Sequence, residues 1–186
     1  MSRPSLYLFA GLPGVGKTTL AQALARASGL AYLRIDTMEQ ALRDLCHLKV
    51  EGEGYSLAYR VASDNLRQGV SVIADSCNPI ALTRKAWRQV AVNAQANCVN
   101  IEVICSDLTE HRRRVNNRTS TIKGLQLPTW EQVEQRTYQP WQADRRVIDT
   151  AGKSAQESIA ELLGLLALGD DKISPQSTEF REIDPH

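Results

Sequence analysis

Short apolar runs alternate along the chain with stretches in which apolar residues recur at helical spacing. Runs of strand length lie near residues 5–10, 30–35, 70–75, 99–105 and 146–148. Helical patterns lie between them, and the clearest, over 20–27, places apolar residues at i, i+3, i+4 and i+7. Strands that alternate with helices are typical of a parallel sheet with helices on both faces and right-handed crossovers. Ligands of such sheets bind beyond the carboxyl ends of the strands.

The composition is that of a folded domain with no strongly charged surface. The 186 residues, 42% hydrophobic and 23% charged, suffice for one domain with a sizeable core. A formal net charge of +1 disfavours nucleic acid and anionic membranes as partners. The apolar run at the N-terminus is too short for a signal peptide or a membrane helix, so we expect a cytoplasmic protein. We expect one domain over 1–168 and a loosely held polar tail over 169–186.

A glycine-rich segment follows the first strand. Residues 11–18, GLPGVGKT, match the pattern G-x-x-x-x-G-K-[ST], with a strand before it and an amphipathic helix after it. The backbone N–H groups of such a loop point inward at phosphate oxygens, and the following helix adds its positive dipole end. A random chain would carry the four fixed positions on the order of one time in a hundred. The segment therefore predicts nucleotide binding.

Individual roles follow from this motif. Lys17, which we expect to be exposed at the mouth of the loop, would reach the β- and γ-phosphates, and the Thr18 hydroxyl would bind magnesium. ATP is favoured over GTP, because the guanine-reading pattern Asn-Lys-x-Asp is absent after the fourth strand. The predicted nucleotide-binding residues are Gly11, Pro13, Gly14, Val15, Gly16, Lys17, Thr18 and Thr19.

Two carboxylates follow the second and third strands. Asp75 directly follows an apolar strand and fits a magnesium ligand. Asp36 fits a general base that accepts the proton of an acceptor hydroxyl, although which of the two carboxylates is the base stays open. Asp36 also fits a helix N-cap, since residues 36–39 read as a capping box. Asn78 and Arg84 either contact the acceptor or belong to a turn that starts a helix.

An arginine-rich segment precedes the fifth strand. On a helix, Arg114 and Arg118 would share one face, where a phosphate chain would relieve their repulsion. This interpretation makes residues 107–140 a lid; the alternative is a solvated basic face. Trp130 and Trp141 lie in the same segment, where packing of a small cap is favoured over stacking on a base.

These motifs resemble those of the P-loop kinases in the group of polynucleotide 5′-hydroxyl kinase, chloramphenicol phosphotransferase, zeta-toxin and adenylylsulfate kinase. The resemblance rests on residues 11–19, 35–36, 73–78, 112–118 and 128–130. It implies an α/β three-layer sandwich of the P-loop NTPase type, with a five-stranded parallel sheet in the order 2-3-1-4-5 and a helical lid. The resemblance also implies that residues 11–19 bind ATP, that Asp36 is the base or contacts the acceptor hydroxyl, and that Arg114 and Arg118 are lid arginines.

The sequence thus predicts a kinase domain over 1–168. It would transfer the γ-phosphoryl group of MgATP to a hydroxyl of a small molecule, with Lys17, Asp36, Arg114 and Arg118 as catalytic residues and Thr18 and Asp75 as metal ligands. Two alternatives stay open. One is a 5′-hydroxyl nucleic-acid kinase, against which the near-zero net charge argues, and the other is a nucleotide-binding ATPase or switch without kinase activity.

Overall fold

The computed structural model describes residues 3–167, which contain a five-stranded parallel sheet in the order β2-β3-β1-β4-β5. The strands span Ser5–Ala10 (β1), Ala31–Arg34 (β2), Val72–Asp75 (β3), Asn97–Ile104 (β4) and Arg146–Asp149 (β5). The predicted fold class and strand order are confirmed. The predicted polar tail, 169–186, lies outside the described residues.

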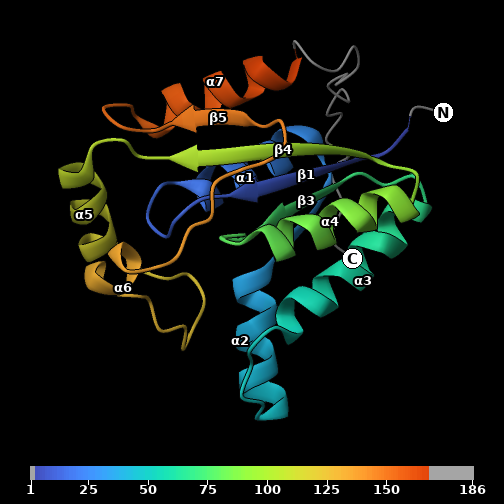
Figure 1. The fold of residues 1–186 in the computed structure, drawn as a ribbon, viewed down its shortest axis with the longest axis horizontal. Coiled ribbons are helices and arrows are strands. Elements are labelled where there is room, and N and C mark those ends of the chain that lie inside the picture. Colours follow the sequence, from blue (N-terminus) through green and yellow to red (C-terminus); the bar gives the residue numbers. More distant parts are fainter. Residues whose placement is uncertain (1–2, 168–186) are drawn as a thin grey trace, which may run out of the picture.

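Helices cover both faces of this sheet (Figure 1). On one face, α1 (Lys17–Ser28) packs against α7 (Ala155–Ala167). On the other face, α3 (Glu53–Arg67) packs against α4 (Ala81–Asn93). The result is the predicted three-layer sandwich. None of the helices within residues 3–167 is long and apolar enough to cross a membrane.

The central strand β1 contributes to both cores. Successive side chains of a strand point to opposite faces of its sheet. Tyr7 and Phe9 pack in the core beneath α1 and α7, whereas Leu6 and Leu8 pack in the core beneath α3 and α4. Because both faces are covered, every residue of this strand is buried. Burial on both faces explains why the strand reads as a nearly continuous apolar run.

Three further helices border the carboxyl ends of the strands. α2 (Ile35–Cys46) directly follows β2 and extends away from the sheet in Figure 1. α5 (Leu108–Asn117) and α6 (Trp130–Glu134) pack against each other at the end of β4. Val115, Trp130 and Val133 form their small shared core. The segment predicted to be a lid therefore lies beside the edge where a ligand would bind.

The start of α2 differs from the prediction. The second strand ends at Arg34, and the helix begins at Ile35 rather than after Asp36. Arg34 is the N-cap, and no side chain caps the helix, so the capping box predicted over 36–39 is wrong. Ile35 is almost fully buried in the core beneath α3 and α4. This burial favours a helix that begins directly after the strand. Asp36 lies within that first turn, where the helix dipole favours an anion.

The glycine that opens the phosphate loop allows a matched test of backbone constraint. Gly11 has a φ of +138°, and a Cβ there would lie 2.1 Å from the Val103 carbonyl oxygen. Gly29 also has a positive φ, +67°, but a Cβ there would meet nothing within 4 Å. We expect Gly11→Ala to lower the free energy of unfolding by about 2–5 kcal/mol, and Gly29→Ala by only about 1–2 kcal/mol. Urea denaturation of both variants measures the difference, and equal losses would contradict the close approach of the loop to β4.

Candidate active site

A cleft of about 720 Å³ opens at the carboxyl edge of the sheet. The phosphate loop, the ends of β2 and β3, the first turn of α2 and the segment after α5 line it. It brings together most of the predicted site residues, namely Pro13, Gly14, Gly16, Lys17, Thr18, Thr19, Asp36, Asp75, Arg114 and Arg118. Gly11 and Val15 do not line the cleft. Val15 is buried in the core beneath α1, and the N–H of Gly11 donates to the Cys77 carbonyl, 3.1 Å away.

The phosphate loop has the backbone that its glycines predict. Gly14 and Gly16 have φ values of +87° and +101°, and α1 begins at Lys17. Lys17 is only 7% exposed, so the expectation that it is exposed at the loop mouth is wrong. Its ammonium group donates to the Leu12 carbonyl at 2.8 Å. A buried ammonium group needs a hydrogen-bond acceptor, and a carbonyl of the loop itself supplies one.

Helix α5 supports this loop directly, through a residue that the sequence did not single out. His111 is 3% exposed, and its Nε2 donates to the Pro13 carbonyl at 2.8 Å. The ring packs edge-on against Trp130, with centroids 5.2 Å apart. A Cβ at Gly14 would lie 2.6 Å from a methyl group of Val115. The predicted cap packing of Trp130 is confirmed, and the packing ties the arginine-rich helix to the phosphate loop.

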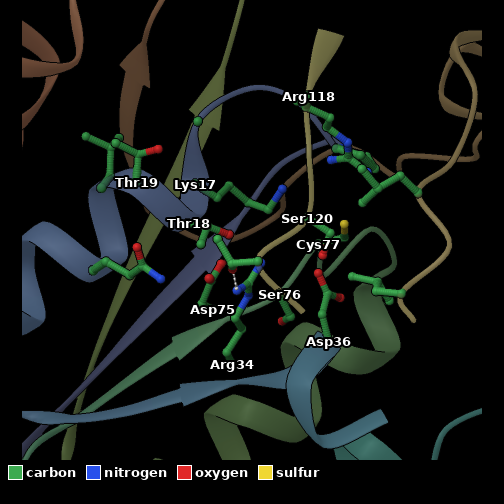
Figure 2. A pocket seen from close by; sticks show the side chains of 18 of the residues that line it. Lys17, Thr18, Thr19, Arg34, Asp36, Asp75, Ser76, Cys77, Arg118 and Ser120 are labelled. Carbon is green, nitrogen blue, oxygen red and sulfur yellow. Dashed lines mark hydrogen bonds between the residues drawn. The ribbon is translucent and has the colours of Figure 1, made fainter. Parts of the chain in front are cut away.

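Asp75 lies at the end of β3 and is 3% exposed. The Tyr32 hydroxyl donates to its Oδ2 at 2.8 Å, and Thr18 is a second hydrogen-bond partner. Burial raises the pKa of Asp75, whereas the charge of Lys17 and the hydrogen bonds from Tyr32 and Thr18 act in the opposite direction. Figure 2 shows Lys17, Thr18 and Asp75 grouped at the start of α1.

The oxygens of Thr18 and Asp75 suit magnesium. Residues 3–167 contain no group of three or more His, Cys, Asp or Glu side chains that could hold a metal ion by themselves. Magnesium does not require such a cage, because it is commonly bound through one or two protein oxygens together with phosphate oxygens and water. A buried carboxylate beside a phosphate-loop hydroxyl fits this donor set.

Asp36 has a different environment from Asp75. It is exposed on the first turn of α2, lines the cleft, and has no side-chain hydrogen bond or ion pair within the described residues. Figure 2 shows its carboxylate facing the cleft from the side opposite Asp75. Of the two carboxylates, Asp36 is therefore the exposed one without a side-chain partner in the described residues, and Asp75 is the one bound into the sheet edge.

The two predicted lid arginines do not share a helix face. α5 ends at Asn117, and Arg118 follows it in an extended conformation, so the predicted i, i+4 arrangement is wrong. Arg114 donates to Thr150 Oγ1 at 2.7 Å and to Glu110 at 2.7 Å, so its guanidinium group is already engaged. Arg118 is half-buried, and within residues 3–167 its side chain has no hydrogen-bond partner. Both arginines line the cleft, but Arg114 is held by three hydrogen bonds to Thr150 and Glu110, whereas Arg118 has no hydrogen-bond partner within residues 3–167.

Arg84 and Asn78 are the other residues that the sequence suggested as contacts of the acceptor. In the structure, both are held by contacts outside the cleft. Arg84 is buried and donates to the carbonyl groups of Asn78, Pro79 and Gln139. Its guanidinium carbon lies 4.3 Å from the centroid of the Trp141 ring. Asn78 is fully buried and donates to the Phe9 carbonyl at 2.8 Å. Neither residue lines the cleft, so both belong to the turn that starts α4.

Comparison with known proteins places this site in a family. Residues 6–140 match the model of a family described as an AAA domain, and the chain belongs to this family. No curated protein matches the chain in sequence.

Solved kinase structures share the fold. They include a gluconokinase from Sinorhizobium meliloti 1021, with 16% identity and a TM-score of 0.64 over 92% of this chain and 96% of that one. The APS kinase CysC of Mycobacterium tuberculosis, in complex with AMPPNP and APS, has 20% identity and a TM-score of 0.64 over 89% and 99% of the two chains. A sugar kinase from Janibacter sp. HTCC2649 has 16% identity and a TM-score of 0.61 over 89% and 95%. At these identities the likeness is one of fold.

The burial of Asp75 predicts a pH-dependent effect on stability. Because its pKa is raised in the folded state, its contribution to stability is present below the pKa of the unfolded chain and is lost as the pH rises through the folded-state pKa. Asparagine cannot ionise. In nucleotide-free protein, the melting temperature of Asp75→Asn relative to wild type should therefore increase from about pH 4 to about pH 8. For a chain of this length, each 1 kcal/mol corresponds to about 2–4 °C.

Asp149 provides a control, because its contribution to stability should depend on pH in the opposite direction. Burial raises its pKa, but hydrogen bonds from Ser106 and Ala151 outweigh this effect and hold the pKa below its ordinary value. Its contribution is present above the unfolded-state pKa and is lost as the pH falls. Asp149→Asn should thus be less stable than wild type near neutrality, and the gap should narrow in acid. A stability gap for Asp75→Asn that follows the same course as that of Asp149→Asn would contradict the assignment of Asp75 as a desolvated carboxylate.

Proposed function

We propose that this protein is a kinase that transfers the γ-phosphoryl group of ATP to a hydroxyl group of a small molecule. The observation that carries the proposal is that one cleft brings together a phosphate loop, the buried Asp75 with its partner Thr18, and the carboxylate of Asp36, which has no side-chain partner within residues 3–167. The shared fold with a gluconokinase, a sugar kinase and an APS kinase in complex with AMPPNP supports it.

The nucleotide phosphates would bind at the phosphate loop. The N–H groups of residues 13–19 and the N-terminus of α1 provide donors and a positive dipole end. Lys17 would exchange the Leu12 carbonyl for phosphate oxygens. Thr18 and Asp75 would hold magnesium, which when bound neutralises charge on the β- and γ-phosphate oxygens. Arg118, with free donors beside this loop, would stabilise charge on the phosphoryl group during transfer.

Asp36 would act as the general base. The acceptor hydroxyl loses its proton to this carboxylate, its oxygen forms a bond to the γ-phosphorus, and the bond between that phosphorus and the bridging oxygen breaks to release ADP. Asp75 is less suited to this role, because its oxygens are buried and hydrogen-bonded to Tyr32 and Thr18. A switch that lacks an acceptor would not need an exposed carboxylate opposite the phosphate loop.

Nucleotide binding is tested by thermal melting with and without MgATP. Ligand at 100 times its dissociation constant should stabilise the wild type by about 2.7 kcal/mol. Lys17→Ala removes a charge-assisted contact to phosphate, so its affinity should fall about tenfold or more. Lys85→Ala, on the exposed surface of α4, should retain the full shift. The absence of any shift in the wild type would refute nucleotide binding.

Asp36→Asn tests the catalytic half of the proposal. The amide keeps the size of the side chain but cannot take up a proton near neutral pH, so transfer should slow by about 10² to 10⁴ while the MgATP-dependent shift in melting temperature is retained. Single-turnover transfer from γ-labelled ATP, to an acceptor identified from a panel of hydroxyl compounds, measures this rate. Asp64→Asn, an exposed carboxylate of α3, is the matched control. Unchanged transfer in Asp36→Asn would remove the base from the mechanism.

A further inference from the structure

The part of the cleft around Asp36 is rich in arginine. Five arginines line the cleft, and two of them are paired with carboxylates. Arg43 lies 3.3 Å from Glu39, and Arg114 lies 2.7 Å from Glu110. The other three form no ion pair within residues 3–167. They are Arg34, Arg118 and Arg136.

These three arginines come from separate elements and line the same cleft. Arg34 ends β2, Arg118 follows α5, and Arg136 follows α6. Burial lowers the pKa of Arg118; the charge of Asp36 opposes this shift, and the charges of Arg136 and Arg34 add to it. The charge of Arg136 also reaches Glu39, one turn from Asp36 on α2. All three arginines line the cleft, and the charges of Asp36, Arg34 and Arg136 all act on Arg118.

Their hydrogen-bonding capacity is largely unused. The Nε atoms of Arg34 and Arg118 are buried and have no partner. The hydrogen bond that Arg34 does make runs from Nη1 to Thr121 Oγ1, at 2.9 Å. Arg136 is exposed, and its side chain makes no hydrogen bond within the described residues. Guanidinium groups brought together without counter-ions repel one another, and a buried donor without a partner is unfavourable.

The carboxylates of the cleft do not offset this charge. Glu39 is paired with Arg43, and Asp75 faces Lys17 and Thr18. Asp36 is the remaining unpaired carboxylate beside the three arginines. Three guanidinium groups against one carboxylate leave a positive surplus, which an anion with several oxygens would neutralise.

We propose that the acceptor carries, in addition to its hydroxyl, a dianionic oxyanion group such as a phosphate, and that Arg34 and Arg136 bind it. This inference rests on the proposed kinase function and specifies its substrate class. Planar guanidinium groups match the oxygens of such an anion in pairs, which a lysine ammonium does not. Arg118, which lines the same cleft as the phosphate loop, would contact the transferring group as well. Binding of the oxyanion would orient the acceptor with its hydroxyl toward Asp36.

Inorganic sulfate is a suitable probe for this site, because it is a dianion at all working pH values. Sulfate is titrated calorimetrically into protein saturated with magnesium and AMPPNP, at constant ionic strength, so that the phosphate loop is already occupied. Wild type should bind sulfate in a saturable manner and acetate, a monoanion, at least about tenfold more weakly. Arg136→Gln and Arg34→Gln should each weaken sulfate binding about tenfold or more and leave AMPPNP affinity within about twofold of wild type. Arg60→Gln, on the exposed face of α3, should bind sulfate as wild type does.

The outcomes distinguish a failure of the proposed kinase function from a failure of the proposed oxyanion site. AMPPNP binding in each variant shows that the variant is folded, and its absence in wild type would refute the proposed kinase function itself. Normal AMPPNP binding with no saturable sulfate site in wild type would refute the oxyanion site alone. The oxyanion site would also be refuted if Arg136→Gln and Arg34→Gln bound sulfate with the same affinity as Arg60→Gln. Acetate binding as tight as sulfate binding would overturn the assignment of a dianion.

Discussion

The phosphate loop keeps its conformation because its backbone is held from several strand ends and from α5 at once. The Gly11 N–H donates to the loop after β3, the Pro13 carbonyl accepts from His111 of α5, and the Val15 carbonyl accepts from Thr150 after β5. Close contact with β4 at Gly11 and with α5 at Gly14 excludes side chains at both positions. The parallel sheet makes this possible, since only there do the ends of all five strands reach the same edge.

The same edge gives two aspartates opposite properties. Asp75 belongs to an interior strand, β3, so it is buried and needs Tyr32, Thr18 and Lys17 to stabilise its charge. Asp36 follows the strand at the edge of the sheet and lies on a helix that leaves the body of the protein, so water reaches it. The buried, hydrogen-bonded carboxylate is the one proposed as a metal ligand, and the exposed one is proposed as the base. Position in the sheet thus separates the environments of the two carboxylates.

Local sequence patterns predicted the features that depend on neighbours along the chain. The phosphate loop, the start of α1 at Lys17 and the alternation of strands and helices all belong to this group, and the strand order followed from a family resemblance. Contacts between distant segments escaped prediction. His111 reaches the loop from 98 residues away and Thr150 from 135, and no pattern within either segment indicates its partner.

The predicted start of α2 near Asp36 and the predicted end of the arginine-rich helix at Arg118 were also wrong, because tertiary contacts and backbone conformation set both helix ends. Burial of Ile35 starts α2 earlier than its polar residues suggest. At Arg118 the chain leaves the helix for an extended conformation, which directs the side chain into the cleft rather than along the helix surface.

A hydrogen bond connects the proposed acceptor site to the segment between α5 and α6. Arg34 is anchored to the sheet at its backbone, where it pairs with Asp75 of β3, and its side chain donates to Thr121 in the segment between α5 and α6. That segment begins at Arg118 and ends where α6 packs on α5, and α5 in turn holds the phosphate loop through His111. An anion bound at Arg34 would therefore compete with Thr121, and one that also engaged Arg118 would act on the start of the same segment. The charge proposed to select the acceptor would then also act on the segment that borders it, so an acceptor without the anion would lose orientation as well as affinity.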